Sequence, residues 1–251
     1  MYDTVIPFFA RFGARLVEVA DLRPGESVLD LGAGRGATLV PAAERVGPSG
    51  RVVGVDLSQE MVALLAAELE RRGLTHASVR RMDAEALEVP PGSFDVAVSS
   101  FVLHLLPHPE AAAAGLVRAL RPGGRVAASV PTGAGPHWDF LMQLFQAFKP
   151  RAIRPIPMPI RPDFDLAALL GSAGLDVMGS LEEELDFVFA DERAWWDWSW
   201  SAGMRAFFES LSPLDLEALR AEAFEKVTGL RTSEGVELRQ RARFVVADKP
   251  P

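Results

Sequence analysis

The sequence predicts an α/β fold in which a parallel sheet carries helices on both of its faces. From Ser27 onward, short apolar segments alternate with longer segments of helical periodicity, a pattern typical of such a sheet. A glycine-rich turn, GAGRG at 32–36, directly follows the first apolar segment. The chain has 251 residues, of which 49% are hydrophobic and 24% charged, so it can bury a sizeable core.

The first half of the chain contains five predicted strands. A helix is expected ahead of them over 4–22, because apolar side chains recur there at helical spacing. This helix either packs on the sheet or covers a ligand as a lid. Ser58 is the expected N-cap of a later helix, since its hydroxyl can accept from a first-turn amide. The strands are expected at 27–31, 51–55, 78–82, 94–99 and 125–130, with helices at 37–46, 59–72 and 110–120.

The second half of the chain departs from this alternation. Residues 131–162 are rich in proline and include an apolar helical stretch at 138–148. A segment that leaves the sheet at the carboxyl end of its fifth strand is well placed to roof a ligand site. The later elements are expected to be a helix at 165–173, a strand or bent hairpin arm at 175–189, helices within 191–228 and a last strand at 242–247.

Composition argues against several classes of function. The formal net charge of -8 opposes binding to nucleic acid. The absence of cysteine excludes disulfides, thiol catalysis and cysteine-ligated zinc, and the four histidines lack metal-ligand spacing, so no metal is expected. Neither a signal-peptide pattern nor an apolar run of about 18 residues occurs, which favours a cytoplasmic enzyme with no membrane partner. We expect a small-molecule substrate and a monomer or homodimer.

The glycine-rich turn is the first candidate binding site. Glycines permit a tight turn and close approach of a ligand to the backbone, and the following helix start presents free amides. Asp56 ends the second strand, where its carboxylate can accept both hydroxyls of a ribose. Because Gly32, Gly34 and Ala37 also satisfy the spacing of dinucleotide sites, these residues leave NAD and S-adenosylmethionine as alternatives.

Three further motifs follow in order. MDA at 82–84 ends the third strand, FDV at 94–96 opens the fourth, and LRPGG at 120–124 precedes the fifth. The series DLGAGRG, GVDLS, MDAEALEVPPGSFDVAVSSFVLH and LRPGGRV resembles the class I S-adenosylmethionine-dependent methyltransferases, in particular the quinone-biosynthesis (type 11) methyltransferases, over residues 26–131. The resemblance implies a Rossmann-like three-layer sandwich: a seven-stranded, mostly parallel sheet with an antiparallel last strand, plus helical cap insertions.

The resemblance also implies a single methyltransferase domain over 1–251. Its expected parts are an N-terminal helical cap at 1–25, a cofactor-binding core at 26–131, substrate-capping insertions at 132–162 and 190–230, and the last strand at 241–248.

The implied cofactor is S-adenosylmethionine, with S-adenosylhomocysteine as the product. Two of the residues implied as donor contacts have structural alternatives: Asp30 can instead brace the loop, and Met61 can belong to the helix core. Asp95 and the LRPGG turn are expected to have structural roles only. The methionine part is expected at Gly32, Ala33 and Gly34, with Asp30 at its ammonium and Ser99 and Ser100 at the sulfonium. The nucleoside is expected at Asp56 for the ribose, Leu57 and Met61 for the adenine faces, and Asp83 and Ala84 for the adenine edge.

Methyl transfer needs positioning and desolvation, and a base only where the acceptor must lose a proton. His104, in FVLH after the fourth strand, is the first candidate base, because an unperturbed imidazole pKa near 6.5 suits that task. Its alternative role is a structural hydrogen bond. His137, in GPHWDF, is the second candidate.

The candidate acceptor-binding residues are mostly aromatic. The segment WWDWSW at 195–200 cannot place all four tryptophans on one helical face, so at least one is expected to point away from the main core. Such rings either line a pocket for a flat, apolar acceptor or pack onto the sheet. Arg205 either pairs with a substrate carboxylate or forms a surface ion pair. The residues expected to contact the acceptor are Phe8, Trp138, Trp196, Trp200 and Arg205.

The favoured function is transfer of a methyl group from S-adenosylmethionine to oxygen, nitrogen or carbon of a small, aromatic or hydrophobic metabolite. Quinone-like precursors and secondary metabolites are the expected acceptors. One alternative is an NAD-dependent oxidoreductase, which the glycine spacing permits. Another is a protein with the methyltransferase fold but without transfer activity, acting as a cyclase or a regulator.

Overall fold

The computed structural model describes residues 5–155, 164–201 and 204–251. Residues 1–4 of the predicted N-terminal cap and 156–162 of the predicted first insertion lie outside these ranges. The strands are β1 (Ser27–Leu31), β2 (Arg51–Asp56), β3 (Ala77–Arg81), β4 (Phe94–Ser100), β5 (Leu120–Gly133), β6 (Asp176–Phe189) and β7 (Val236–Asp248). The α-helices are α1 (Phe8–Val19), α2 (Leu39–Val46), α3 (Gln59–Arg71), α4 (Pro109–Ala119), α5 (Phe140–Phe148), α6 (Leu166–Ser172), α7 (Glu192–Ser199), α8 (Arg205–Ser210) and α9 (Pro213–Thr228). Short 3₁₀ helices are η1 (Ala84–Ala86), η2 (Leu103–Leu105), η3 (Pro136–Trp138) and η4 (Lys149–Arg151).

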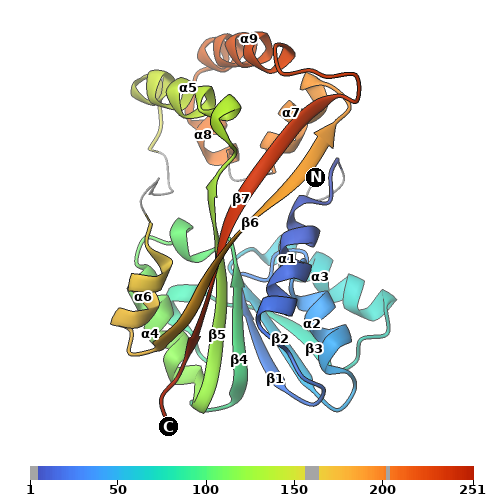
Figure 1. Cartoon of the computed structure of the whole chain (residues 1–251), viewed down its shortest axis with the longest axis vertical. Helices are drawn as coiled ribbons and strands as arrows, with labels where there is room; N and C mark the ends of the chain where they lie inside the picture. The colour runs from blue at the N-terminus through green and yellow to red at the C-terminus, as the bar shows by residue number, and fades with distance from the viewer. Residues whose placement is uncertain (1–4, 156–163, 202–203) are drawn as a thin grey trace. The chain divides into compact units, whose positions relative to one another are not determined.

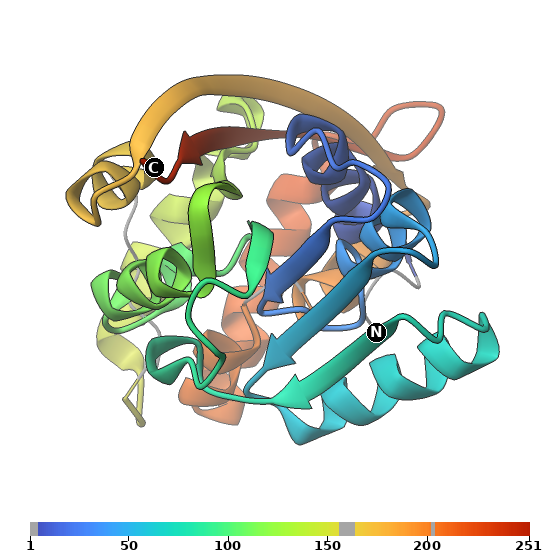
Figure 2. The ribbon, with the colours of Figure 1, turned by 90° about the horizontal axis from the view of Figure 1, so that it is seen from below.

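The seven strands form one sheet in the order β3-β2-β1-β4-β5-β7-β6. The first five are parallel. Val28 of β1 lies opposite both Val52 of β2 and Val96 of β4, which are in turn opposite Ala77 of β3 and Arg125 of β5. Figure 2 shows β1, β2 and β3 side by side, with α3 along β3.

Strand β7 runs antiparallel to its neighbours. Lys249 exchanges backbone hydrogen bonds with Gly123 and Gly124 near the start of β5, whereas the Gln240 amide donates to Gly133 at its end. On its other edge β7 pairs with β6, and each step of two residues forward along β7 corresponds to two residues backward along β6. The ion pairs that show this register are Arg239–Asp186 (2.7 Å), Arg241–Glu184 (3.8 Å) and Arg243–Glu182 (3.1 Å). The predicted fold class, a mostly parallel seven-stranded sheet with an antiparallel last strand, is therefore confirmed.

The chain divides into two compact units. The core unit consists of Phe9–Pro131, Ile160–Glu182 and Arg243–Pro251. The second, which we call the aromatic unit, consists of Met1–Phe8, Thr132–Pro159 and Glu183–Ala242. Within the aromatic unit, α5 and α7 both pack beside α9, as Figure 1 shows.

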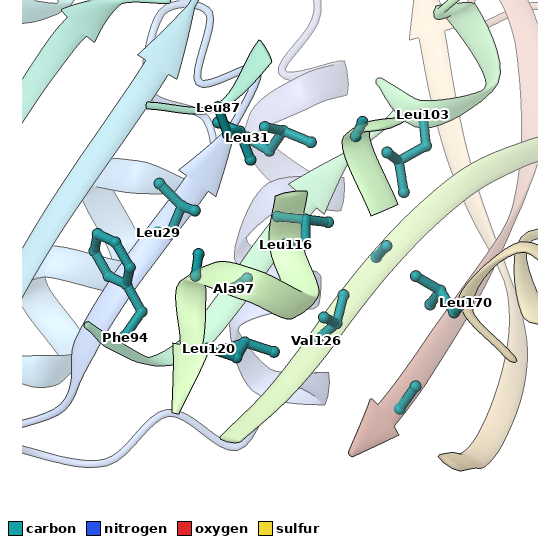
Figure 3. Packing of buried hydrophobic residues seen from close by; sticks show 14 of the residues in the cluster. Leu29, Leu31, Leu87, Phe94, Ala97, Leu103, Leu116, Leu120, Val126 and Leu170 are labelled. Carbon is teal, nitrogen blue, oxygen red and sulfur yellow. The ribbon is translucent and has the colours of Figure 1, made fainter. Parts of the chain in front are cut away.

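The core unit buries β1, β2, β4 and β5 on both faces, as expected of a parallel sheet covered by helices, whereas the edge strand β3 has no buried residue. One face carries a continuous apolar cluster, in which Leu116 of α4 and Leu170 of α6 lie over Ala97 of β4 and Val126 of β5 (Figure 3). Alternate residues of the same strands, such as Val96 and Ala127, are fully buried on the opposite face. This rigid sheet places the carboxyl ends of β1, β2 and β4 at one edge, where α/β proteins bind ligands.

Helix α1 packs tightly within the core unit. Phe12 and Leu16 are fully buried. At the end of α1, the Arg125 guanidinium donates to the carbonyls of Ala20 (2.7 Å) and Asp21 (2.8 Å) and also pairs with Glu26 (2.8 Å). A cation at a helix C-terminus satisfies carbonyls that have no partner within the helix. The N-terminal helix was expected either to pack on the sheet or to cover a ligand as a lid, and these contacts are typical of a packed helix.

Several boundaries differ from the predictions. Strand β5 begins at Leu120 rather than Arg125, because the LRPGG backbone continues the sheet through its hydrogen bonds with Lys249. Strand β7 begins at Val236 rather than 241 or 242; its polar residues conceal the strand in the sequence because they form ion pairs with β6. The helix expected at 37–46 begins at Leu39, and the helical region at 191–228 consists of α7, α8 and α9.

Replacing Arg125 with methionine should destabilise the protein by about 1–3 kcal/mol, because the largely buried Glu26 and two helix-terminal carbonyls lose their partner. Chemical denaturation monitored by circular dichroism would measure this. The matched control is Arg23→Met, since Arg23 pairs with Asp21 on the exposed surface, where ion pairs contribute little. Equal stabilities of Arg125→Met and the wild type would contradict the role of Arg125.

Candidate functional site

Backbone hydrogen bonds hold the glycine-rich turn in one shape at the end of β1. The amides of Gly32 and Ala33 both donate to the carbonyl of Val55 on β2, at 2.8 and 2.9 Å. Farther along, the amide of Gly36 donates to Ala33. Gly32, Gly34 and Gly36 have positive φ angles, which glycine adopts without steric cost. The turn is thus tied to the next strand before any ligand binds.

Asp56 connects the end of β2 to this turn. One carboxylate oxygen accepts from the Gly34 amide at 2.8 Å, and the other accepts from the Ser58 amide at 2.9 Å. Each carboxylate oxygen has a further lone pair, and the side chain is half-buried, so it can still accept ligand hydroxyls. Ser58 is the N-cap of α3, as predicted: its hydroxyl accepts from the Met61 amide at 3.3 Å.

Asp30 is a buried carboxyl at the same end of the sheet. Only 1% of the residue is exposed, and its Oδ2 atom has no hydrogen-bond partner among the described residues. Burial, reinforced by the nearby charge of Asp56, raises the pKa of Asp30 to about 8, although a hydrogen bond from the Leu39 amide opposes that rise. Asp30 therefore carries a proton at neutral pH in the absence of a cationic partner.

Gly32 also has a packing role that differs from the one predicted. A Cβ atom at this position would lie 2.3 and 2.9 Å from the two methyl carbons of Val102. The sequence suggested that glycine is needed here for close approach of a ligand. In the structure, glycine is also required because the Val102 side chain occupies the space of a larger residue.

The ends of β2 and β3 lie next to each other. The Met82 amide donates to the Asp56 carbonyl at 2.9 Å, which holds the following residue, Asp83, close to the β2 end. Asp83 is exposed, and its carboxylate accepts from the Glu85 amide at the start of η1, in which Ala84 is half-buried. Leu57 is 63% exposed, unusual for a leucine, so its side chain is available to a ligand at this edge.

Ser99 and Ser100 end β4 in different surroundings. Ser99 is fully buried, and its hydroxyl donates to the Leu31 carbonyl at 3.3 Å, so it joins β4 to the end of β1. Ser100 is half-buried with its hydroxyl 3.3 Å from that of Ser129. The next residue, Phe101, has a φ angle of 57°, a backbone conformation that is uncommon for a residue with a side chain.

The two candidate bases belong to different units. His104 lies on η2 in the core unit, half-buried, with its ring edge-on to Phe164 at 6.3 Å between centroids. His137 lies on η3 in the aromatic unit and is exposed. A third histidine, His108, is an exposed residue just before α4, and its backbone amide donates to Glu85.

The aromatic unit contains all five residues expected to contact the acceptor. Phe8 is buried between Phe187 (5.1 Å between centroids) and Trp198 (5.0 Å). Trp138 is buried against Trp195 at 5.7 Å, and its indole N–H donates to the carbonyl of Glu237 at 3.1 Å.

Trp196 and Trp200 share a neighbour, Phe208, at 4.8 and 5.0 Å. The three tryptophans of α7 are all buried, because aromatic rings surround this helix on more than one side; Trp200, beyond the helix, is only partly buried. Arg205 is 71% exposed and pairs with Glu209 at 2.7 Å. The surface ion pair is thus the alternative that the structure supports for Arg205.

Several residues of these sites were missed in the sequence. Val102 and Phe101 are an ordinary apolar pair in FVLH, and nothing in their spacing indicates the close approach to Gly32 or the positive φ. Trp198 lies between two other tryptophans, and Phe187 is one of two phenylalanines in an apolar strand segment, so nothing in the sequence distinguishes either residue. Gly13, within α1, does carry a signal in the sequence, because a glycine inside an apolar helical pattern indicates close packing.

In residues 5–155, 164–201 and 204–251, no three His, Asp or Glu side chains are grouped so that they could hold a metal ion. Within the same ranges, every helix is too short or too polar to cross a lipid bilayer.

Comparison with known proteins identifies the family. Residues 28–124 match the family described as "Methyltransferase domain". The nocamycin O-methyltransferase of Saccharothrix syringae is 36% identical over 244 residues, which cover 91% of this chain and 87% of that protein. This chain belongs to the class I S-adenosylmethionine-dependent methyltransferases. The alternative of an NAD-dependent oxidoreductase is thereby set aside.

Two further proteins are similar to this methyltransferase. The aklanonic acid methyltransferase of Streptomyces sp. strain C5 is 38% identical over 164 residues, covering 64% of this chain and 74% of that protein. A crystal structure of an S-adenosylmethionine-dependent methyltransferase from Aquifex aeolicus superposes with a TM-score of 0.56 at 21% identity, over 70% of this chain and 86% of that chain. That structural likeness shows a common fold.

The residues at the carboxyl end of the sheet fit the methyl donor S-adenosylmethionine. The buried Oδ2 of Asp30, without a partner among the described residues, suits a cationic group such as the donor's ammonium. Asp56 keeps lone pairs for ribose hydroxyls. At Gly34 a Cβ would meet nothing closer than the Gly32 carbonyl at 4.0 Å, so this part of the turn is open to a ligand. The individual roles of these residues stay predictions.

Asp30 should make the stability of the ligand-free methyltransferase depend on pH. Its folded-state pKa, about 8, lies above the unfolded value of 3.8, so the neutral carboxyl favours folding. This contribution is fully present below pH 3.8 and is lost as the pH rises toward 8. Asp30→Asn cannot ionise, so its melting temperature should exceed that of the wild type increasingly between pH 5 and 8. A constant difference over this range would contradict the raised pKa.

Proposed function

We propose that this methyltransferase methylates an oxygen atom of a small, hydrophobic or aromatic carboxylic acid in secondary metabolism. The observation that carries the proposal is the similarity to nocamycin O-methyltransferase over nearly the whole of both chains. That relative is named for an oxygen acceptor, and the second relative is named for aklanonic acid. A carboxylic acid that is methylated on its carboxylate oxygen is consistent with both names.

The chemistry of a carboxylate acceptor supports this proposal. S-adenosylmethionine supplies an activated methyl group on its sulfonium. A carboxylic acid is ionised at neutral pH, so its oxygen can take up the methyl group without first losing a proton to the protein. The enzyme then needs positioning and exclusion of water rather than a general base. In this proposal His104, half-buried beside Phe164, orients groups near the reaction and does not remove a proton.

We assign the methyl donor to the core unit. Asp30 would pair with its ammonium and Asp56 would bind its ribose hydroxyls. Leu57 and Asp83, at the adjoining ends of β2 and β3, would contact the adenine. These assignments use side chains whose burial or open lone pairs suit each group, and they agree with the resemblance in the sequence.

We assign the acceptor to the aromatic unit. Flat apolar molecules bind well to clustered aromatic side chains, which provide large contact areas and stacking. Phe8, Phe187 and Trp198 form one such cluster, and Trp196, Trp200 and Phe208 form another. The net charge of -8 supports a small-molecule acceptor over nucleic acid.

Binding of S-adenosylhomocysteine, measured by calorimetry, tests the donor site. Asp56→Ala should raise the dissociation constant roughly tenfold or more, because hydrogen bonds to a charged group contribute about 1.5–3 kcal/mol. Glu70→Ala, which removes an exposed carboxylate from α3, is the control.

The affinity of the wild type for S-adenosylhomocysteine should also increase as the pH rises toward 8, since Asp30 must release its proton to pair with an ammonium. Asp30→Asn should bind weakly at every pH; a wild-type affinity independent of pH would contradict the pairing.

Incubation with S-adenosylmethionine and aklanonic acid tests the acceptor class. The expected product has gained one methyl group by mass spectrometry and releases the original acid in mild base, as an ester does. At saturating donor, the rate should not follow a group titrating near pH 6.5. If the rate instead rises through that pH and His104→Ala abolishes the rise, His104 is a base and the acceptor is a hydroxyl. Methylation at nitrogen or carbon alone across a panel of aromatic acids would refute the proposal.

A further inference from the structure

Gly13 lies in the interior of α1, where glycine is unfavourable by about 1 kcal/mol relative to alanine. The structure gives the reason for its presence. A Cβ atom on Gly13 would lie 2.3 Å from the carbonyl oxygen of Ala37, 2.5 Å from the carbonyl carbon and 2.9 Å from the Thr38 nitrogen. All three atoms belong to the backbone, so none can move away by a side-chain rotation. Helix α1 therefore contacts the chain at Ala37 and Thr38 directly, backbone against backbone.

The segment beneath Gly13 is the exit of the glycine-rich turn. Ala37 follows Gly36, and Thr38 precedes α2 and is buried. The amide of the next residue, Leu39, is the one that hydrogen-bonds to Asp30. The position of this short segment thus sets both the end of the turn and the hydrogen bond to the buried carboxyl.

Helix α1 also supports the other side of the donor site. Phe12, adjacent to Gly13, packs against Phe101 at 5.1 Å between centroids. Phe101 follows Ser100 at the end of β4, and its neighbour Val102 fills the space over Gly32. Two consecutive residues of α1 therefore contact the chain after the glycine-rich turn and the chain after β4.

The helix is a fixed support rather than a mobile one. Arg125 holds its C-terminal end through two backbone carbonyls and Glu26, and Phe12 is fully buried. A fixed helix in backbone contact with Ala37 and Thr38 keeps that segment from shifting outward. Binding sites whose loops are already in the bound shape avoid the cost of ordering them when the ligand arrives.

We propose that Gly13 is a positioning residue for the methyl donor: by letting α1 touch Ala37 and Thr38, it holds the glycine-rich turn in its donor-binding shape. The proposal rests on the assignment of Asp30, Asp56 and the turn to S-adenosylmethionine. It extends the donor site to a helix that precedes the first strand and touches no donor atom in this assignment.

The test compares Gly13→Ala with two variants chosen for stability. Gly13→Ala should raise the dissociation constant for S-adenosylhomocysteine about tenfold or more at 25 °C, because the turn is displaced by the added methyl group. Leu170→Ala leaves a cavity under α6, away from α1 and the glycine-rich turn, and should lower the melting temperature without changing this constant. Gly171→Ala adds a methyl group to α6, where a Cβ meets only Val177 at 3.9 Å, and should change neither affinity nor fold.

The results distinguish a failure of the positioning role of Gly13 from a failure of the donor-site assignment on which it rests. If Asp56→Ala binds normally, the donor-site assignment fails. If Asp56→Ala binds weakly but Gly13→Ala binds as the wild type does, Gly13 has only a packing role and this proposal is overturned. A loss of affinity in Leu170→Ala equal to that in Gly13→Ala, at equal loss of stability, would overturn it as well. Should Gly13→Ala not fold, Phe12→Leu replaces it, with a smaller rise in the dissociation constant expected and wild-type affinity contradicting the proposal.

Discussion

The hydrogen bond between the Asp56 carboxylate and the Gly34 amide is the interaction on which the shape of the proposed donor site depends. It joins the turn after β1 to the end of β2, so the two strands that carry the site end at a fixed spacing. The carbonyl of Val55 strengthens this connection by accepting from two further amides of the turn. A turn held this way presents its open side, at Gly34, before any ligand binds. Preorganised sites of this kind bind without first paying for loop ordering.

The buried carboxyl of Asp30 gives the same site its electrostatic character. Water is excluded from it, and Asp56 adds a second negative charge nearby, so the neutral form is favoured until a cation approaches. Such a group is unfavourable in a protein that has no use for it. In the proposed function it pairs with the ammonium of the methyl donor, which is cationic at neutral pH. That pairing would distinguish this site from a loop that binds only a nucleoside.

The aromatic unit meets a different physical demand. Its rings are packed at centroid distances of about 5 Å around α7, which buries three tryptophans that a single helix face could not cover. The charged ladder between β6 and β7 leaves the opposite side of those strands free for apolar residues. Packing of this kind suits the small, hydrophobic or aromatic acceptor of the proposed function.

Most of the core unit could be predicted from the sequence, because local rules determine it: apolar alternation, an N-cap at Ser58, and glycines where φ is positive. The meeting of the ends of β1, β2 and β4 also followed, since the carboxyl ends of parallel strands lie at one edge of a sheet. The roles of the residues there were implied by the family resemblance and stay predictions. Only the tertiary structure decided the rest. A glycine within the pattern of α1 signals close packing, but only the structure shows that the partner of Gly13 is Ala37. The approach of Val102 to Gly32 likewise joins residues far apart in the chain, and the burial of Asp30 depends on the surrounding elements. Ion pairing across strands likewise concealed the start of β7 as a polar segment.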